Sequence, residues 1–498
     1  MPNTERSIAI PQAVDEELRS HLLKGDGQEE LAFALWSPSK GAHRITALLN
    51  SLIPPVEGDR QRHGNASFNP QYFQRVCEIA ASEPGLGIAF MHSHLGPGWQ
   101  GMSDDDVRAE LRIAGAVEAV TELPLVGLTV GTDGTWSARM WPYVGNKQHA
   151  REWCASVRVL GSRLKVDYND NLIAPPEFRE LFKRTVTTWG EQNQLTLARL
   201  RFGIVGLGSV GSIVAETLAR MGMKRFVLID FDEVQSHNLD RLLGAHESDI
   251  GALKIAVAER QIRRAATAAN VEIQAVPYSI AEESGYRSAL DCDVLFSCVD
   301  RPRPRNILNH FAYSHLIPVI DGGIEVRFKH GKFSGVDWQL QTAGPGRACL
   351  QCLETFLPGD VGTEIEGKLD DPSYLKNLPP DHRLKRNENV FPFSANLASL
   401  EVLQMVELVT EIGGIGGFGV QRYRYLPGTL EVYPMRTCRA DCEYQSLLAQ
   451  GDRYFSLYGR DIGAEKARQR QGSVRKQNSL IGLIRKGLTL IRGKREAH

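Results

Sequence analysis

The chain has 498 residues, of which 42% are hydrophobic and 23% charged, and its formal net charge at pH 7 is −1. These values exclude collagen-like, disordered and coiled-coil proteins and argue against specific nucleic-acid binding through bulk charge, while the length predicts two or three domains. No apolar run reaches the ~18 residues that span a bilayer, and residues 1–10 lack the apolar core of a signal peptide. Eight cysteines are too few for a secreted disulfide scaffold. We therefore expect a soluble, cytoplasmic, multidomain protein.

Residues 1–165 are expected to form one mixed α/β domain. Residues 1–24 are polar and predict a short leader. The apolar pattern then predicts two strands within 29–53, further strands at 87–91, 125–130 and 135–141, and helices over 70–82 and 104–120. Ser103 is a candidate cap for the second of these helices.

A candidate metal site follows the strand at 87–91. His92 and His94 are two residues apart, so both imidazoles can leave the same face of the sheet. A bend rich in glycine and proline then leads to Ser103 and a run of three aspartates, Asp104 to Asp106. Two imidazoles and one carboxylate form a catalytic zinc site with an open position for water, and Glu29 or Glu30 could move protons. The alternative is a histidine pair bonded to backbone beside a solvated helix start.

This order of residues resembles the JAB/MPN (JAMM) metalloprotease family over about residues 20–160. The resemblance implies that His92, His94 and Asp106 hold zinc, that Glu29 is the general acid/base, and that Ser103 stabilises the oxyanion. The bend is one residue longer than the family's usual spacing, so Asp105 competes with Asp106 as a ligand. We expect Asp106, which keeps the three-residue step from Ser103. Glu29 is preferred over Glu30 because small and apolar residues follow it at the family's spacing.

Residues 166–450 are expected to form a second domain, set off by a charged stretch that contains Pro175-Pro176. Strands and helices alternate here, which predicts a parallel, doubly wound, Rossmann-like sheet. The expected strands are 202–206, 226–230 and 294–297, and the expected helices are 209–221 and 253–267.

A glycine-rich turn follows the first of these strands. Gly206, Gly208 and Gly211 permit a tight turn in which phosphate approaches the amides of a helix N-terminus. Asp230 ends the next strand, where an acid can bind ribose hydroxyls. Taken alone, this pattern predicts an NAD-dependent oxidoreductase as readily as an ATP-binding enzyme.

Further polar residues favour a nucleotide triphosphate. Asn238, Arg241 and Lys254 bring more polar and positive groups than NAD requires, and Asp300 follows a strand where it could bind magnesium. The alternative is that Arg241 and Lys254 are surface charges and Asp300 is a helix cap.

In this order the residues resemble the ThiF/MoeB/ubiquitin-activating enzyme family over about residues 180–445. The resemblance implies adenylation of the C-terminal carboxylate of a ubiquitin-like protein by MgATP, usually in a homodimer. By position, the three glycines line the nucleotide, Asp230 holds the ribose, Asn238, Arg241 and Lys254 address the phosphates, and Asp300 binds magnesium. Leu242 departs from the family, where glutamine commonly follows the arginine.

Four cysteines in two close pairs predict a closed, structural zinc site: Cys349, Cys352, Cys438 and Cys442. The alternative is four unrelated buried cysteines. The resemblance places a thioester-forming cysteine, where a family member has one, beyond the first cysteine pair, but residues 353–437 contain no cysteine. Cys292 and Cys298 are expected to be buried. Transfer beyond the acyl adenylate therefore falls to a thiol elsewhere in the chain or to a partner.

Residues 451–498 are expected to form a basic tail. Its segment 480–495 is amphipathic, so it could contact an anionic membrane surface or an acidic partner, and otherwise it is a solvated tail.

The residues themselves indicate two sites, and the two family resemblances together imply a bifunctional enzyme of a prokaryotic ubiquitin-like system. A zinc peptidase head would process or remove the ubiquitin-like protein, and an ATP-dependent head would activate its carboxylate. A conjugating-enzyme-like or sulfur-donor protein could receive the product. The alternatives are an NAD-dependent oxidoreductase and a non-catalytic scaffold that binds a ubiquitin-like protein through a degenerate metal site.

Overall fold

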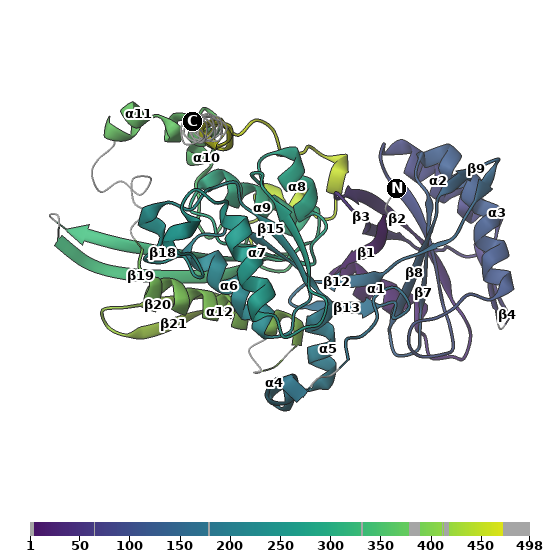
Figure 1. The fold of residues 1–498 in the computed structure, drawn as a ribbon. Helices are drawn as coiled ribbons and strands as arrows, with labels where there is room; N and C mark the ends of the chain where they lie inside the picture. The colour runs from purple at the N-terminus through teal and green to yellow at the C-terminus, as the bar shows by residue number, and fades with distance from the viewer. Residues whose placement is uncertain are drawn as a thin grey trace, which may run out of the picture.

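The computed structural model contains two α/β domains joined along a broad seam (Figure 1). It describes residues 4–471 apart from residue 64 and the segments 178–179, 330–331, 378–388, 411 and 413–417. Each domain is built on its own large sheet.

The first domain has a nine-stranded mixed sheet in the order β11-β8-β7-β6-β2-β3-β1-β12-β13. In that order the strands are Glu152–Trp153, Trp136–Trp141, Leu125–Val130, Gly87–Ser93, Leu31–Lys40, Arg44–Ile53, Glu5–Pro11, Ser156–Leu160 and Leu164–Tyr168. The helices are α1 (Gln12–Leu22), α2 (Pro70–Ser82) and α3 (Asp104–Thr121), and short hairpins pair β4 (Arg60–His63) with β5 (Asn65–Phe68) and β9 (Tyr143–Gly145) with β10 (Gln148–His149).

The expectation of a leader at residues 1–24 is wrong. Residues 5–11 form β1, which pairs in parallel with both β3 and β12 inside the sheet. Ile8, Ala9 and Ile10 are fully buried. The apolar run is short and has charged neighbours, so local composition does not predict a strand here. The strand is stabilised by pairing with β3 and β12, which lie far along the chain.

The second domain has an eight-stranded sheet in the order β16-β15-β14-β17-β18-β19-β20-β21. The strands are Glu272–Val276, Arg225–Ile229, Arg201–Val205, Val294–Ser297, Val319–Lys329, Lys332–Ala343, Phe418–Arg424 and Thr429–Pro434. The strands from β16 to β18 are parallel, as predicted, and the strands from β19 onward add an antiparallel extension that the sequence pattern did not predict.

Helices cover both faces of this sheet. One apolar cluster packs α6 (Ser209–Arg220), α7 (Lys254–Ala265) and α12 (Phe391–Thr410) on one face, and a second packs α8 (Glu283–Ala289) and α9 (Pro302–Ser314) on the other. Further helices are α4 (Lys183–Trp189), α5 (Glu191–Arg199), α10 (Pro358–Ile365), α11 (Pro372–Asn377) and α13 (Glu443–Ser446), and residues 462–471 are also helical. The order 3-2-1-4-5 of the parallel strands places a switch point beside β14, which is where doubly wound sheets bind ligands.

Buried charges hold the two domains together. Asp293, which lies just before β17, accepts hydrogen bonds from Arg44 of β3 at 2.6 Å and from Arg158 of β12 at 3.0 Å. Arg44 is 1% exposed and Arg158 is fully buried. Asp291 accepts hydrogen bonds from the backbone N–H groups of His43 and Arg44 at 3.1 and 2.9 Å.

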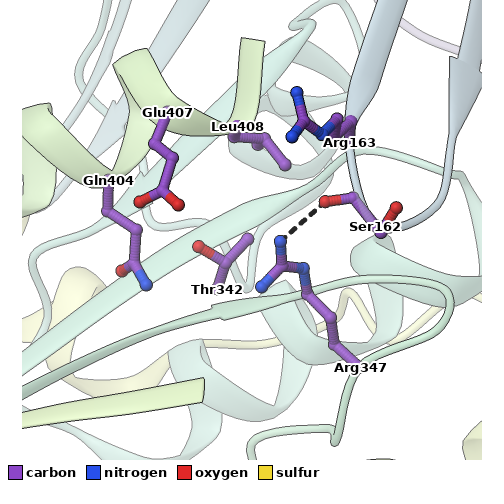
Figure 2. Close-up of a pocket in the computed structure, with 7 residues that line it drawn as sticks. All are labelled: Ser162, Arg163, Thr342, Arg347, Gln404, Glu407 and Leu408. Atoms are coloured by element: carbon purple, nitrogen blue, oxygen red, sulfur yellow. Dashed lines mark hydrogen bonds between the residues drawn. The ribbon is translucent and has the colours of Figure 1, made fainter. Parts of the chain in front are cut away.

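The seam also has an apolar part and a small polar cavity. A single apolar cluster joins Ala9 and Leu48 of the first domain to Leu200 and Phe202 of the second. Figure 2 shows the cavity, where Arg347 reaches across to donate to the carbonyl of Ser162 at 2.7 Å. Gln404, Glu407 and Leu408 of α12 line its other side, with Arg163 and Thr342 completing it. The two domains therefore form one packed unit.

Two expected boundaries shift. The first sheet continues past residue 165, because β13 ends at Tyr168. The expected separate tail at 451 is wrong for residues 451–471, which pack on both domains: Arg453 pairs with Glu83 at 3.1 Å and Asp452 with Arg287 at 2.8 Å. The amphipathic segment 480–495 lies outside the described residues. Within the described part of the chain, no helix combines the length and apolarity needed to cross a bilayer.

Candidate functional site

The structure brings His92, His94 and Asp106 together at one end of the first sheet. The Nε2 atoms of His92 and His94 are 3.0 Å apart, and each lies 3.4 Å from an oxygen of Asp106. All three ligand atoms lie within 4.8 Å of one another. This donor set fits zinc, with a fourth position left for water.

The start of α3 explains the position of Asp106. The Ser103 hydroxyl accepts a hydrogen bond from the Asp106 backbone N–H at 3.1 Å, and the Asp106 carboxylate accepts from the Ser103 N–H at 2.8 Å. This is a capping box, which orients Asp106 toward the histidines. Asp105 instead points to solvent and pairs with Arg108 at 2.7 Å. The geometry therefore favours Asp106 over Asp105 as the ligand.

Burial prepares His92 for metal binding. It lowers the pKa of His92 to about 3, so the imidazole is neutral at pH 7, as a metal ligand must be. Burial opposes ionisation of Asp106, but hydrogen bonds from His94 and Ser103 lower the pKa of its carboxyl.

The two candidate proton carriers have different surroundings. Glu30 is fully buried and forms ion pairs with Lys24 at 2.9 Å and Arg60 at 3.0 Å. Glu29 is partly exposed and interacts electrostatically with His94 and Asp106, and burial raises the pKa of its carboxyl. Of the two, Glu29 has the position and the freedom to exchange protons at this site.

The glycine-rich turn lies between β14 and α6 in the second domain. Gly206 has φ +87°, and a Cβ there would meet the Cys298 carbonyl at 2.5 Å. A Cβ on Gly211 would meet the Gly206 carbonyl oxygen at 1.9 Å, so the close approach of turn and helix requires glycine. Gly208, at the N-cap of α6, has no neighbouring atom within 4 Å of its Cβ position. A side chain at Gly208 would meet nothing, and the free N–H groups of the first turn of α6 are of the kind that bind phosphate.

Acidic and basic side chains gather beside this turn. Asp230, just after β15, accepts hydrogen bonds from the N–H groups of Leu207 at 2.6 Å and Asp232 at 2.7 Å. Lys254 pairs with Asp232 at 2.8 Å. Burial lowers the pKa of Lys254, but Asp230 and Asp232 outweigh it and raise that pKa, and Asp300 adds to the effect. Lys254 is therefore a fixed positive charge between the ends of β15 and β17.

Asn238 and Arg241 lie on the loop between β15 and α7. Asn238 accepts from the Gln235 N–H at 3.0 Å, and Arg241 donates to the His237 carbonyl at 2.6 Å. The Leu243 N–H donates to the Ser212 hydroxyl of α6 at 3.3 Å, which holds this loop against the helix that starts at the glycine turn. Leu242 is buried in a small apolar cluster with Val234 and Val257, which explains an apolar residue at this position.

The four cysteines of the second domain form one cluster. The sulfur atoms of Cys349, Cys352, Cys438 and Cys442 all lie within 4.8 Å of one another. The Cys349 N–H donates to the Cys438 sulfur at 3.1 Å, and the Cys352 N–H donates to the Cys349 sulfur at 3.3 Å. Amides directed at sulfur suit thiolates, so the cluster fits a closed tetrahedral zinc site.

Sequence reasoning placed Asp232 in the nucleotide region but assigned it no role. The only sequence feature that indicates a role for Asp232 is its position two residues after Asp230. In the structure Asp232 forms the ion pair with Lys254 and so helps to hold that lysine beside the glycine turn. Cys292 is fully buried, and Cys298 lies partly buried beneath the glycine turn, 3.9 Å from the Glu401 carboxylate. Neither thiol is displayed to a large substrate.

Several known proteins are similar to part of this chain. A tRNA threonylcarbamoyladenosine dehydratase of Escherichia coli is 28% identical over 31% of this chain and 57% of its own length. The molybdopterin-synthase adenylyltransferase of Escherichia coli is 28% identical over 35% of this chain and 66% of its own length. Ubiquitin-like modifier-activating enzyme 5 of Drosophila willistoni is 27% identical over 30% of this chain and 37% of its own length. The chain thus spans between about a third and two thirds of these relatives.

A solved structure of E. coli MccB with MccA-N7isoASN aligns with a TM-score of 0.42 and 16% identity, covering 54% of this chain and 75% of that one. The model of the ThiF family matches residues 182–430, which is half of the chain and leaves the first domain outside the match. The chain belongs to the ThiF family.

Proposed function

We propose that the second domain activates a terminal carboxylate by adenylation with MgATP. The observation that carries the proposal is the convergence, at one sheet edge of a ThiF family member, of the open glycine turn, the Asp230–Asp232–Lys254 group and Asp300. A carboxylate oxygen would attack the α-phosphorus of ATP, the bond to the β-phosphate would break, and pyrophosphate would leave.

Each residue has a role in this proposal. The amides at Gly208 would bind phosphate, and Asp230 would bind the ribose hydroxyls. Lys254, Arg241 and Asn238 would contact the charged phosphate chain. Asp300 would hold magnesium, which when bound neutralises phosphate charge. The family match favours this function over an NAD-dependent oxidoreductase.

We propose a ubiquitin-like protein as the carboxylate donor. A groove of about 450 Å³ lies beside the cysteine cluster and follows β19 and β20. Its lining includes four arginines: Arg347, Arg422, Arg436 and Arg439. Gln341 in its wall donates to Asp321 at 2.6 Å, and Asp321 accepts from Ser297 at the end of β17, so the groove adjoins the strand that leads to Asp300. A positive groove of this size suits an extended chain end that carries a carboxylate.

The test is ATP–pyrophosphate exchange with purified protein and a panel of ubiquitin-like and sulfur-carrier proteins. Exchange that requires one carrier and its free C-terminus is the expected result. Exchange with none of them, but with a carboxylate on modified tRNA, would instead extend the dehydratase relative's substrate to this chain. ATP binding without exchange on any carrier or on tRNA would contradict the adenylating function.

We propose that the acyl adenylate passes to a nucleophile on a partner, either a conjugating-enzyme-like protein or a sulfur donor. The burial of Cys292 and the position of Cys298 beneath the glycine turn support this. A homodimer formed through the second domain remains part of the proposal, as does a cytoplasmic location.

We further propose that the first domain is a zinc peptidase for the same carrier. His92, His94 and Asp106 would hold the metal, which when bound lowers the pKa of a water molecule toward ~7. Glu29 would take the proton from that water, and Ser103 would hold Asp106 in place and face the developing oxyanion.

Glu29→Gln is expected to lower cleavage of C-terminally extended ubiquitin-like proteins by about 100- to 10,000-fold, because the amide cannot act as a general base. Asp105→Asn is the matched control, since Asp105 is an exposed acid outside the cluster. Equal cleavage by Glu29→Gln and wild type, measured by mass spectrometry, would remove Glu29 from this role.

A further inference from the structure

The last described helix, residues 462–471, lies outside the part of the chain that matches the ThiF family. It forms the yellow end of the described chain in Figure 1, and Ile462 at its start lies against Gly367, in the segment after α10. Ala464 and Ala467 are buried on its inner face. We refer to residues 462–471 as the C-terminal helix.

Polar contacts connect the C-terminal helix to three loops of the second domain. Gln471 donates to the Phe231 carbonyl, between Asp230 and Asp232, at 3.2 Å. Arg468 forms a two-pronged ion pair with Glu282, with one bond of 2.9 Å, and lies 5.5 Å from the centre of the Tyr278 ring. These loops follow β15 and β16, respectively.

The third contact reaches the region of Asp300. Lys466 donates to the Asp370 carbonyl at 3.0 Å, and the Asp370 carboxylate pairs at 2.8 Å with Arg301, the neighbour of Asp300. The C-terminal helix therefore spans the carboxyl edge of the parallel sheet, from the end of β15 and the loop after β16 to the segment after β17. A nucleotide in a doubly wound sheet lies at this edge.

We propose that the C-terminal helix forms an outer wall of the nucleotide site and that Arg468 and Gln471 are positioning residues for it. The proposal rests on the adenylating function above. Phosphates occupy the glycine turn, so the loops after β15 and β16, which continue from the ribose-binding position of Asp230, face the base and ribose. By fixing these loops before binding, Arg468 and Gln471 reduce the ordering that ATP must impose.

The test compares two ligands on the full-length protein by isothermal titration calorimetry with Mg²⁺ present. In the double variant Arg468→Ala/Gln471→Ala, the Kd for ATP is expected to rise about tenfold, which is about 1.4 kcal/mol. The Kd for inorganic tripolyphosphate is expected to change less than about twofold, since that ligand has no base or ribose. Arg468→Lys is expected to recover part of the loss, because lysine keeps the charge beside Glu282 without the two-pronged geometry.

Arg470→Ala is the matched control, since Arg470 is exposed on the same helix and donates to the carbonyl of Lys466 within it. Unchanged or tighter ATP binding by the double variant, or an equal loss for ATP and tripolyphosphate, would overturn the inference. Wild-type protein that binds no ATP would overturn the adenylating function and the inference with it. Wild type that binds ATP, with a double variant indistinguishable from it, overturns the inference alone.

Discussion

Asp300→Asn is expected to reduce ATP–pyrophosphate exchange by about 100- to 1,000-fold, since it removes the negative charge proposed to hold magnesium against the phosphates. Asp300 is exposed and has no hydrogen bond or ion pair to residues that the structure describes, although its charge acts on Lys254. The free energy of unfolding should therefore change by less than about 0.5 kcal/mol.

This combination separates a chemical role from a structural one. Exchange is measured with the carrier found by the panel, and unfolding is followed in denaturant on the same protein. Glu247→Gln, another exposed acid of the second domain, is expected to leave exchange unchanged. Retention of more than about a third of the exchange by Asp300→Asn would place the magnesium elsewhere.

Arg44→Ala is expected to lower the free energy of unfolding by about 3–5 kcal/mol. The substitution leaves the Asp293 carboxylate buried with only Arg158 as a charged partner, and it also removes donors to the carbonyls of Leu290 and Cys292. Breaking a buried ion pair from one side costs this much because the remaining charge stays out of water.

The effect should reach both domains, because one apolar cluster crosses the seam. Denaturant unfolding followed by circular dichroism should show a single transition that shifts as a whole. Arg108→Ala, which breaks the exposed pair with Asp105, is expected to cost less than about 1 kcal/mol. If Arg44→Ala lowered the free energy of unfolding by as little as Arg108→Ala, the buried ion pairs between the domains would contribute little to stability.

Local patterns predicted much of the fold. The apolar run at 87–91, the helices over 70–82 and 104–120 and the first parallel strands of the second domain all form where periodicity and capping residues indicate. In each case the signal lies within the element. The strand β1 escaped prediction because its partners β3 and β12 lie far along the chain.

The candidate sites divide in the same way. Short spacings brought together His92, His94 and Asp106 and the four cysteines, because a strand end, a capped helix or a close pair fixes their geometry. Other contacts join residues more than two hundred positions apart: the ion pair of Arg44 with Asp293 and the hydrogen bond from Gln471 to the Phe231 carbonyl. No local pattern encodes such pairs, and only the folded chain reveals them.

The claim that one chain carries two chemical heads is tested most directly by zinc content per chain. Elemental analysis should find two zinc ions in the wild type. His92→Ala/His94→Ala should lose one of them, and Cys349→Ser/Cys352→Ser should lose the other. A single zinc that disappears only with the cysteine variant would contradict the two-headed enzyme, and would leave the first domain as a binding module attached to a ThiF family domain.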